Sequence, residues 1–238
     1  MLWANNNLHM AIEKSSRFDF DLLADRYDSW YESAKGRMYD RSEKKAISRY
    51  LPRSAKGKTL LEVGCGTGHW SRFLSEYGFK VTGVDVSEPM IKIAQSKDIP
   101  IASFQVADGH SLPFDDNSFD VSAAITTLEF VHDAELVLQE MARCTRKPGG
   151  QLLVGVLNVL ARLNRNRKQR HGSPYAKARL FSPNQLKQLL EPFGQLAMVT
   201  AGFVPNQKLF LPLAPLIDTV GRILHIPYGA FIAAEVKL

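Results

Sequence analysis

The sequence predicts an α/β fold in which a doubly wound, mostly parallel sheet carries helices on both faces. Short apolar runs with strand character alternate with segments of helical apolar spacing through residues 58–157, and such alternation is typical of parallel strands joined by right-handed crossovers. A glycine-rich turn joins the first of these strands to the first of these helices. Polar or glycine residues also follow each of the first four strands, at the sheet edge where such folds bind ligands.

The overall composition is that of an ordinary globular protein. The 238 residues are 45% hydrophobic and 23% charged, which suits one domain with decorations. The net charge of +6 permits anionic partners without requiring them, because the basic excess is local. The two cysteines, Cys65 and Cys144, offer neither a disulfide framework nor a zinc spacing, which favours a reducing compartment and no bound metal.

Signals for targeting or membrane insertion are not evident. Residues 1–16 lack the basic start and apolar run of a signal peptide and look loosely ordered. No apolar run approaches the roughly 20 residues of a membrane helix. We therefore expect a cytoplasmic protein without a stable membrane span. The sequence leaves the oligomeric state open between a monomer and a homodimer.

The first 52 residues are predicted to form a helical lid ahead of a main domain at residues 53–238. Apolar residues from Phe20 to Tyr31 recur at threes and fours. A second helix is expected from Met38 to Tyr50, where Pro52 follows. The aromatic residues of this segment either pack against the sheet or cover a ligand. They are Tyr27, Trp30, Tyr31 and Tyr39.

The main domain opens with a strand, Leu60–Val63, that runs directly into Gly64, Gly66 and Gly68, and helical spacing begins at His69. A strand, then glycines, then a helix amino end brings backbone N–H groups against a ligand, and larger residues would block that approach. The dinucleotide fingerprint G-x-G-x-x-G is the nearest motif. Its third glycine would fall at position 69, which His69 occupies.

Each of the next two strands is followed by an acidic residue. Residues 79–87 form a predicted strand with Asp85 at its carboxyl end, and a helix capped by Ser87 follows over residues 88–96. Residues 101–106 form the third strand, which leads to Asp108. An acid at the end of the second strand can accept hydrogen bonds from both hydroxyls of a ribose. The alternative for both aspartates is an ordinary position in a solvated turn.

The remaining elements complete the sheet and then depart from regular alternation. The expected elements are a polar loop at 112–120, a strand at 121–126, a helix at 134–146, a strand at 151–157, a helix at 182–190, a strand at 196–203 and a closing strand at 230–237. Residues 158–228 form an insertion on the substrate side. Its basic run, residues 162–170, is expected to be a solvated loop. Its proline-rich part, residues 203–228, either lines an apolar pocket or covers a sheet edge.

The segment Glu62–Gly68, with Asp85 and Asp108 after the next two strands, resembles the class I S-adenosylmethionine (SAM) methyltransferases. The resemblance covers residues 58–157 and is most similar to the small-molecule branch that includes ubiquinone and menaquinone methyltransferases. It is strongest at residues 61–68, 84–87, 106–109, 112–120 and 148–154. It implies a Rossmann-like, seven-stranded sheet, mostly parallel with an antiparallel last strand. It also implies SAM as the cofactor and S-adenosylhomocysteine as the product.

The resemblance further implies where SAM binds. The three glycines would approach the methionine part of SAM, Asp85 the ribose and Asp108 the adenine. The other expected cofactor contacts are Glu62, Cys65, Val86, Met90, Gly109, Thr126 and Leu128. Met90 could equally belong to the core. Cys65 is interpreted as a small packed residue and not as a reactive thiol.

Methyl transfer from a sulfonium is an in-line displacement, for which alignment alone can supply roughly 7–11 kcal/mol of the barrier. The chemistry therefore demands no obligatory catalytic residue, although a base helps where the nucleophile carries a proton. Glu129 and His132, just past the fourth strand, are candidate catalytic residues, as is Tyr27 of the lid. His132 could instead be an exposed residue near the start of the next helix, which Asp133 is expected to cap.

We therefore predict a SAM-dependent methyltransferase that acts on a small-molecule acceptor, and we do not expect a nucleic-acid partner. The basic run at residues 162–170 lacks the interleaved aromatic residues that nucleic-acid stacking requires. Two alternatives remain open, an RNA methyltransferase and a non-catalytic regulatory protein that keeps the SAM site. A nicotinamide-dependent oxidoreductase is disfavoured by His69 and by the adenine-reading position of Asp108.

Overall fold

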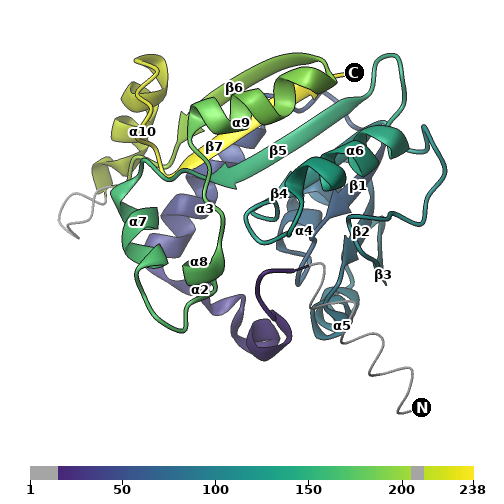
Figure 1. The fold of residues 1–238 in the computed structure, drawn as a ribbon, viewed down its shortest axis with the longest axis horizontal. Helices are drawn as coiled ribbons and strands as arrows, with labels where there is room; N and C mark the ends of the chain where they lie inside the picture. Colours follow the sequence, from purple (N-terminus) through teal and green to yellow (C-terminus); the bar gives the residue numbers. More distant parts are fainter. Residues whose placement is uncertain (1–15, 205–211) are drawn as a thin grey trace.

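The computed structural model describes residues 16–204 and 212–238, and its centre is a seven-stranded sheet (Figure 1). The strand order is β3-β2-β1-β4-β5-β7-β6, with β7 antiparallel to both of its neighbours. The strands are β1 (Thr59–Val63), β2 (Lys80–Asp85), β3 (Ala102–Val106), β4 (Val121–Ile125), β5 (Gln151–Leu157), β6 (Gln195–Ala201) and β7 (Phe231–Lys237). The predicted sheet, with its reversed last strand, is confirmed.

Helices cover both faces of the sheet. Those between the strands are α4 (His69–Glu76), α5 (Glu88–Ser96), α6 (Ala134–Cys144), α9 (Pro183–Leu190) and the short 3-10 turn η2 (Glu191–Phe193). The amino-terminal elements are η1 (Asp21–Arg26), α2 (Ser29–Glu32) and α3 (Ala34–Ile47), and the elements after β5 also include α7 (Arg162–Lys168), α8 (Pro174–Lys177) and α10 (Ala214–Ile223). Within the described residues, no helix combines the length and the apolar character that crossing a bilayer requires.

The core has two halves, one on each face of the sheet. The helices α6 and α9 cover one face of the sheet, and α3 and α4 cover the other (Figure 1). In β4, Ala124 points to the first half, and Ala123 and Ile125 point to the second. Because both faces are covered, β4 is buried at every position, which explains its unbroken apolar sequence. The lid segment is also tied to this core, since Ala46 and Ile47 of α3 belong to it.

Side-chain caps place several helix starts where the sequence predicts them. The Ser87 hydroxyl accepts a hydrogen bond from the Met90 N–H at 3.3 Å. The Asp133 carboxylate accepts two at the start of α6, and Ser182 forms a capping box with Gln185 at the start of α9. Each cap satisfies N–H groups that the first turn of a helix leaves without partners. These helices therefore begin at fixed residues.

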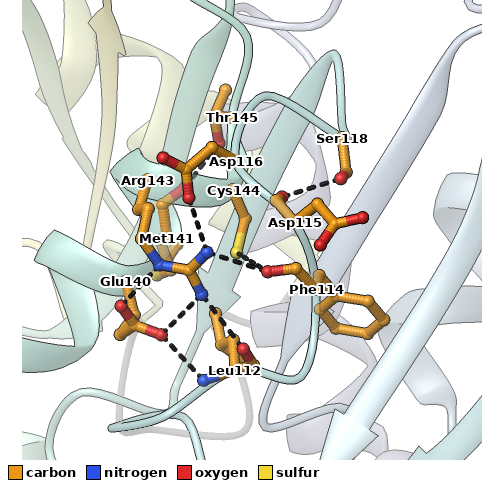
Figure 2. Close-up of polar contacts among 10 residues, drawn as sticks. All are labelled: Leu112, Phe114, Asp115, Asp116, Ser118, Glu140, Met141, Arg143, Cys144 and Thr145. Carbon is orange, nitrogen blue, oxygen red and sulfur yellow. Dashed lines mark hydrogen bonds and ion pairs between the residues drawn. The ribbon is translucent and has the colours of Figure 1, made fainter.

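The crossover from β3 to β4 contains no helix, and the polar loop expected at residues 112–120 lies within it. A loop makes this crossover, and Arg143 of α6 holds it (Figure 2). The guanidinium donates to the Phe114 carbonyl at 2.8 Å, to the Leu112 carbonyl at 3.0 Å and to Asp116 at 2.8 Å. Glu140 accepts from the same guanidinium and from the Leu112 N–H. The Arg143 side chain thus fixes the path of this loop.

Two predicted segments differ in form. The basic run is the helix α7 and not a solvated loop, because Asn164 on its inner side donates to the carbonyls of Asn158 and Ala230 at 2.9 and 2.6 Å. The lid helix expected from Met38 begins earlier, since the Ser33 hydroxyl caps α3 by accepting from the Gly36 N–H at 2.9 Å. The loosely ordered segment expected at residues 1–16 lies almost wholly outside the described residues.

Candidate active site

The glycine turn between β1 and α4 is shaped by backbone conformation and by lack of space. Gly64, Gly66 and Gly68 all have positive φ, at 73°, 52° and 80°, which L-residues rarely adopt. A Cβ on Gly64 would also collide with the side chain of Thr127. The Gly64 N–H donates to the Val84 carbonyl at 2.8 Å. The turn therefore lies against the ends of both β2 and β4, and its backbone borders the space between them.

Asp85, the last residue of β2, joins this turn to the start of α5. Its Oδ2 accepts from the Gly66 N–H at 2.8 Å, and its Oδ1 accepts from the Ser87 N–H at 3.0 Å. Burial raises the pKa of Asp85, although these backbone hydrogen bonds oppose the rise. The carboxylate thus braces the glycine turn and also lines the neighbouring cavity.

Asp108 follows β3 and is held by the residue two positions further on. Its Oδ1 accepts from the His110 N–H at 2.9 Å and lies 2.7 Å from Nδ1 of the His110 ring. Burial alone would raise the pKa of Asp108, but these hydrogen bonds lower it below its ordinary value. Asp108 is therefore an oriented carboxylate at the cavity wall.

The carboxyl ends of β1 to β4 border a first cavity of about 640 Å³ that is open to solvent. It is lined by eight of the expected cofactor contacts, namely Gly64, Gly66, Asp85, Val86, Met90, Asp108, Gly109 and Thr126. Further lining residues that the sequence reasoning missed are Ser16, Phe20, Val63, Ala107, Thr127, Phe130 and Val131. Val63, Ala107 and Thr127 are sequence neighbours of expected cofactor contacts at the ends of strands. Their position at a strand end is therefore the sequence signal that could have identified them.

Four expected cofactor contacts do not line this cavity. Glu62 is buried beneath the turn, where its Oε2 accepts from the Ser71 hydroxyl at 2.5 Å. Cys65 is buried and Leu128 belongs to the core between the sheet and α6. Gly68 begins α4, and a Cβ there would meet Ile99. Three of them shape or support the turn, Leu128 packs in the core, and contact of these four residues with SAM stays a prediction.

A second cavity, of about 830 Å³, lies under the lid and adjoins the first. Four residues, Phe20, Tyr27, Thr126 and Phe130, line both cavities. The other lining residues are Leu23, Arg26, Trp30, Tyr31, Glu43, Leu157, Arg167, Pro174 and Tyr175. Six of its thirteen lining residues are aromatic, and its walls come from the lid, from α7 and α8, and from the ends of β4 and β5.

Three charged residues, Arg26, Glu43 and Arg167, line this space, and Glu43 lies within electrostatic reach of Arg167. The Arg167 guanidinium carbon lies 4.5 Å from the ring centroid of Trp30 and 5.0 Å from that of Tyr175, which are cation–π distances. Burial raises the pKa of Glu43 to about 7, although the positive charge of Arg167 opposes the rise. The sequence reasoning selected neither Glu43 nor Arg167, because their neighbourhood depends on contacts between distant segments.

The lid is fastened to the glycine turn at the start of α4. Asp40 of α3 lies 2.6 Å from Nε2 of His69, and it also pairs with Lys44 at 2.9 Å. The Tyr31 ring stacks on the His69 ring with centroids 3.6 Å apart. His69, which departs from the dinucleotide fingerprint, therefore connects the lid to the turn.

Two further lid acids reach the same region. Asp28 accepts from the Thr67 hydroxyl at 2.7 Å and pairs with Lys97 at 2.6 Å. Asp21 accepts from the Ser87 hydroxyl at 2.5 Å. Tyr39 differs from the other lid aromatics because it lines neither cavity. It is 3% exposed and packs beside α7 and β7, so the packing interpretation fits it best.

Of the three candidate catalytic residues, only Tyr27 lines the cavities. His132 is exposed and lines neither, and its carbonyl accepts from Arg17. Glu129 is fully buried, where its Oε1 accepts from the Leu157 N–H at 2.5 Å and burial raises its pKa to about 8. His132 therefore lies outside both cavity linings and its role as a base stays a prediction, whereas Glu129 holds β5 from within the protein.

Comparison with known proteins places this geometry in a family. Residues 61–154 match a methyltransferase domain model. An uncharacterized protein of Methanocaldococcus jannaschii is 32% identical over 178 residues, which cover 74% of this chain and 80% of that protein. A SAM-dependent methyltransferase from Thermotoga maritima, described as a possible histamine N-methyltransferase, superposes with a TM-score of 0.72 at 26% identity, over 92% of this chain and 97% of its own.

A demethylmenaquinone methyltransferase of Oceanobacillus iheyensis is 34% identical over 141 residues. The match covers 56% of this chain and 58% of that enzyme, so this chain spans little more than half the length of that relative. The sheet order, the glycine turn and these similarities agree with one another. The chain belongs to the class I SAM-dependent methyltransferases, and its cofactor is SAM.

Proposed function

We propose that this enzyme transfers the methyl group of SAM to a small, flat and largely apolar acceptor that binds in the second cavity. The observation that carries the proposal is that the two cavities adjoin and share Phe20, Tyr27, Thr126 and Phe130. An acceptor in the aromatic cavity would present its nucleophile to a cofactor in the first cavity. Concave, mainly apolar sites with a few polar groups are typical of small-molecule binding.

The two aspartates, the glycine backbone and Met90 of the first cavity have proposed contacts with SAM. Asp85 would accept from the ribose hydroxyls and Asp108 from the adenine amine. Backbone groups of Gly64 and Gly66 would face the methionine part, and Met90 would cover the adenine ring. The residues fit this cofactor because backbone hydrogen bonds orient both carboxylates at the cavity wall. SAM supplies an electrophilic methyl group on a sulfonium.

The chain's own contribution to the reaction is alignment and removal of a proton. The lid and the β4 end exclude water and hold the nucleophile in line with the methyl group, which is the main source of acceleration expected for such a displacement. Burial raises the pKa of Tyr27, so its hydroxyl stays protonated and serves as a hydrogen-bond donor. Glu43, whose pKa of about 7 suits a base near neutral pH, would take the proton that an O–H or N–H acceptor releases.

The relatives narrow the class of acceptor that merits testing. The similarity to a demethylmenaquinone methyltransferase supports a hydroquinone-like ring as one candidate. The resemblance to a possible histamine N-methyltransferase supports a ring bearing an amine as another. Both are flat molecules that stack on aromatic walls.

The test uses SAM with a labelled methyl group, incubated with the protein and either a fractionated extract or a panel of hydroquinones, phenols and ring-bearing amines. We expect label in a small molecule that chromatography separates from protein and RNA. Label recovered in RNA would favour an RNA methyltransferase. Tight SAM binding by calorimetry with no labelled product from any fraction would favour a non-catalytic SAM-binding protein.

A further inference from the structure

The helix α10 exposes a stripe of large apolar side chains to solvent. They recur every three or four residues, so they share one face of the helix and its continuation. The stripe consists of Leu213, Leu216, Ile217, Val220, Ile223 and Leu224, which are between 37% and 68% exposed. Tyr228, 63% exposed, extends it. Single exposed apolar residues are common, but a continuous stripe of this kind marks an interaction surface.

The opposite face of α10 is polar and fixes the orientation of the stripe. Asp218 and Arg222 are both buried and form an ion pair at 2.7 Å. Asp218 also accepts from the N–H groups of Gly202 and Phe203 at 2.7 and 3.2 Å. Turning α10 to bury its apolar stripe would break this buried ion pair and leave charges without partners. The outward stripe is therefore a property of the fold.

The chain segment that contains the stripe is rich in basic residues. Residues 158–228 contain ten Lys and Arg residues and two acidic residues, in a chain whose net charge is +6. Arg41 and Lys45 of α3 are exposed and line a cleft with Ala214 and Pro215 at the start of α10. The helix α7, at the same side of the molecule as α10 in Figure 1, exposes Arg162, Arg165 and Lys168.

We propose that α10 and these basic residues dock the protein on an anionic lipid surface. An exposed apolar helix face beside cationic side chains is the arrangement that binds a membrane interface, with the apolar residues between the acyl chains and the cations at the anionic headgroups. A second copy of the chain fits less well. Each copy carries a net charge of +6, and like charges repel.

Flotation with lipid vesicles tests this proposal without SAM or an acceptor, so its result is independent of the proposed acceptor site. The vesicles are made of phosphatidylcholine alone or with about one third phosphatidylglycerol. We expect at least about tenfold tighter binding to the anionic vesicles, with weakening as salt is added. Combined replacement Leu216→Ser and Ile223→Ser should weaken that binding by at least about tenfold. Charge reversal by Arg165→Glu and Lys168→Glu should weaken it as well.

The matched control replaces two exposed apolar residues elsewhere, Ile101→Ser and Leu136→Ser, which are 58% and 39% exposed. These changes should leave vesicle binding unaltered, and unchanged SAM affinity shows that every variant is folded. Absence of binding to anionic vesicles, or equal binding to neutral ones, overturns the proposal. A second outcome would also overturn it. In this outcome the unaltered protein is a dimer in sedimentation equilibrium, the Leu216→Ser and Ile223→Ser variant is a monomer, and both bind vesicles equally. RNA binding that depends on the basic residues, with no vesicle binding, overturns it in favour of a nucleic-acid surface.

Discussion

At the scale of single residues, the first cavity depends on carboxylates that are oriented by the backbone. Asp85 accepts from two N–H groups that belong to the glycine turn and to the start of α5. It therefore sets the shape of the cavity and offers a charge to its contents. Glu62 has the complementary position, because it supports the turn from below without lining the cavity.

Replacement of Asp85 by alanine should weaken SAM binding by at least about tenfold, because losing one charge-assisted hydrogen bond costs more than about 1.4 kcal/mol. Isothermal calorimetry of both proteins measures the effect. Asp115→Ala, an exposed aspartate of the β3–β4 loop, is the control and should bind SAM as the unaltered protein does. Equal affinity in Asp85→Ala would show that the ribose is held elsewhere.

Glu62 should make the protein less stable as pH rises. Burial raises its pKa to about 8 in the folded state, against an ordinary value of 4.5. Between about pH 5 and about pH 8 the unfolded chain loses this proton while the folded chain keeps it, so the free energy of unfolding falls with increasing pH. Glu129 and Glu43 also have raised pKa values and contribute to this fall. Glu62→Gln removes one of these three titrating groups and should make the fall less steep, as measured by urea unfolding across this range.

The control for Glu62→Gln is Glu135→Gln, a change at an exposed position in the first turn of α6. It should keep the pH dependence of the unaltered protein. A Glu62→Gln variant with the same slope as the unaltered protein would contradict the assignment of part of that slope to Glu62.

At the scale of elements, polar contacts fasten the amino-terminal segment, which we propose to act as a lid, to the start of α4. Asp40 connects α3 to His69, and Tyr31 stacks on the same ring. These contacts lie beside the turn that borders the cofactor cavity. Opening of the lid and access to the first cavity should therefore be coupled.

Asp40→Ala should increase lid opening roughly fivefold, since a partly exposed hydrogen-bonded pair contributes about 1 kcal/mol. Hydrogen exchange followed by mass spectrometry should show faster exchange in residues 21–47 and little change in the sheet. Asp25→Ala, an exposed position of η1, is the control and should leave exchange unaltered. Uniformly faster exchange throughout Asp40→Ala would indicate general destabilisation and not a lid contact.

The elements also show what the sequence could predict. The helices α5 and α9 have local caps and apolar periods, and both begin where expected. The helix α7 was expected as a loop, because it has no apolar period and its inward residue, Asn164, is polar. Asn164 bonds to the carbonyl of Ala230, 66 residues away, so no local pattern could reveal it. Asp85 and Asp108 could be predicted because each follows a strand that the sequence pattern reveals. Glu43 and Arg167 are distant in sequence and come together only in the tertiary fold.

At the scale of the whole molecule, the insertion after β5 and the lid before β1 close over the same edge of the sheet. The sheet provides the cofactor cavity from its strand ends, and the two added segments provide most of the walls of the aromatic cavity. A common sheet can thus keep one methyl donor while the added segments determine the acceptor. This separation predicts that changes in the insertion alter acceptor binding without altering SAM binding.

Arg167→Met tests that separation, because methionine retains apolar contact with the rings of Trp30 and Tyr175 and removes the charge. With the acceptor identified by the labelling experiment, we expect its KM to rise by roughly tenfold, equivalent to about 1.4 kcal/mol, while the Kd for SAM stays the same. The control is Arg165→Met, which changes an exposed residue of the same helix and should alter neither constant. An equal loss of affinity for SAM and for the acceptor in Arg167→Met would show that Arg167 supports the fold of the lid and insertion. Binding in one cavity would then depend on the same residue as binding in the other.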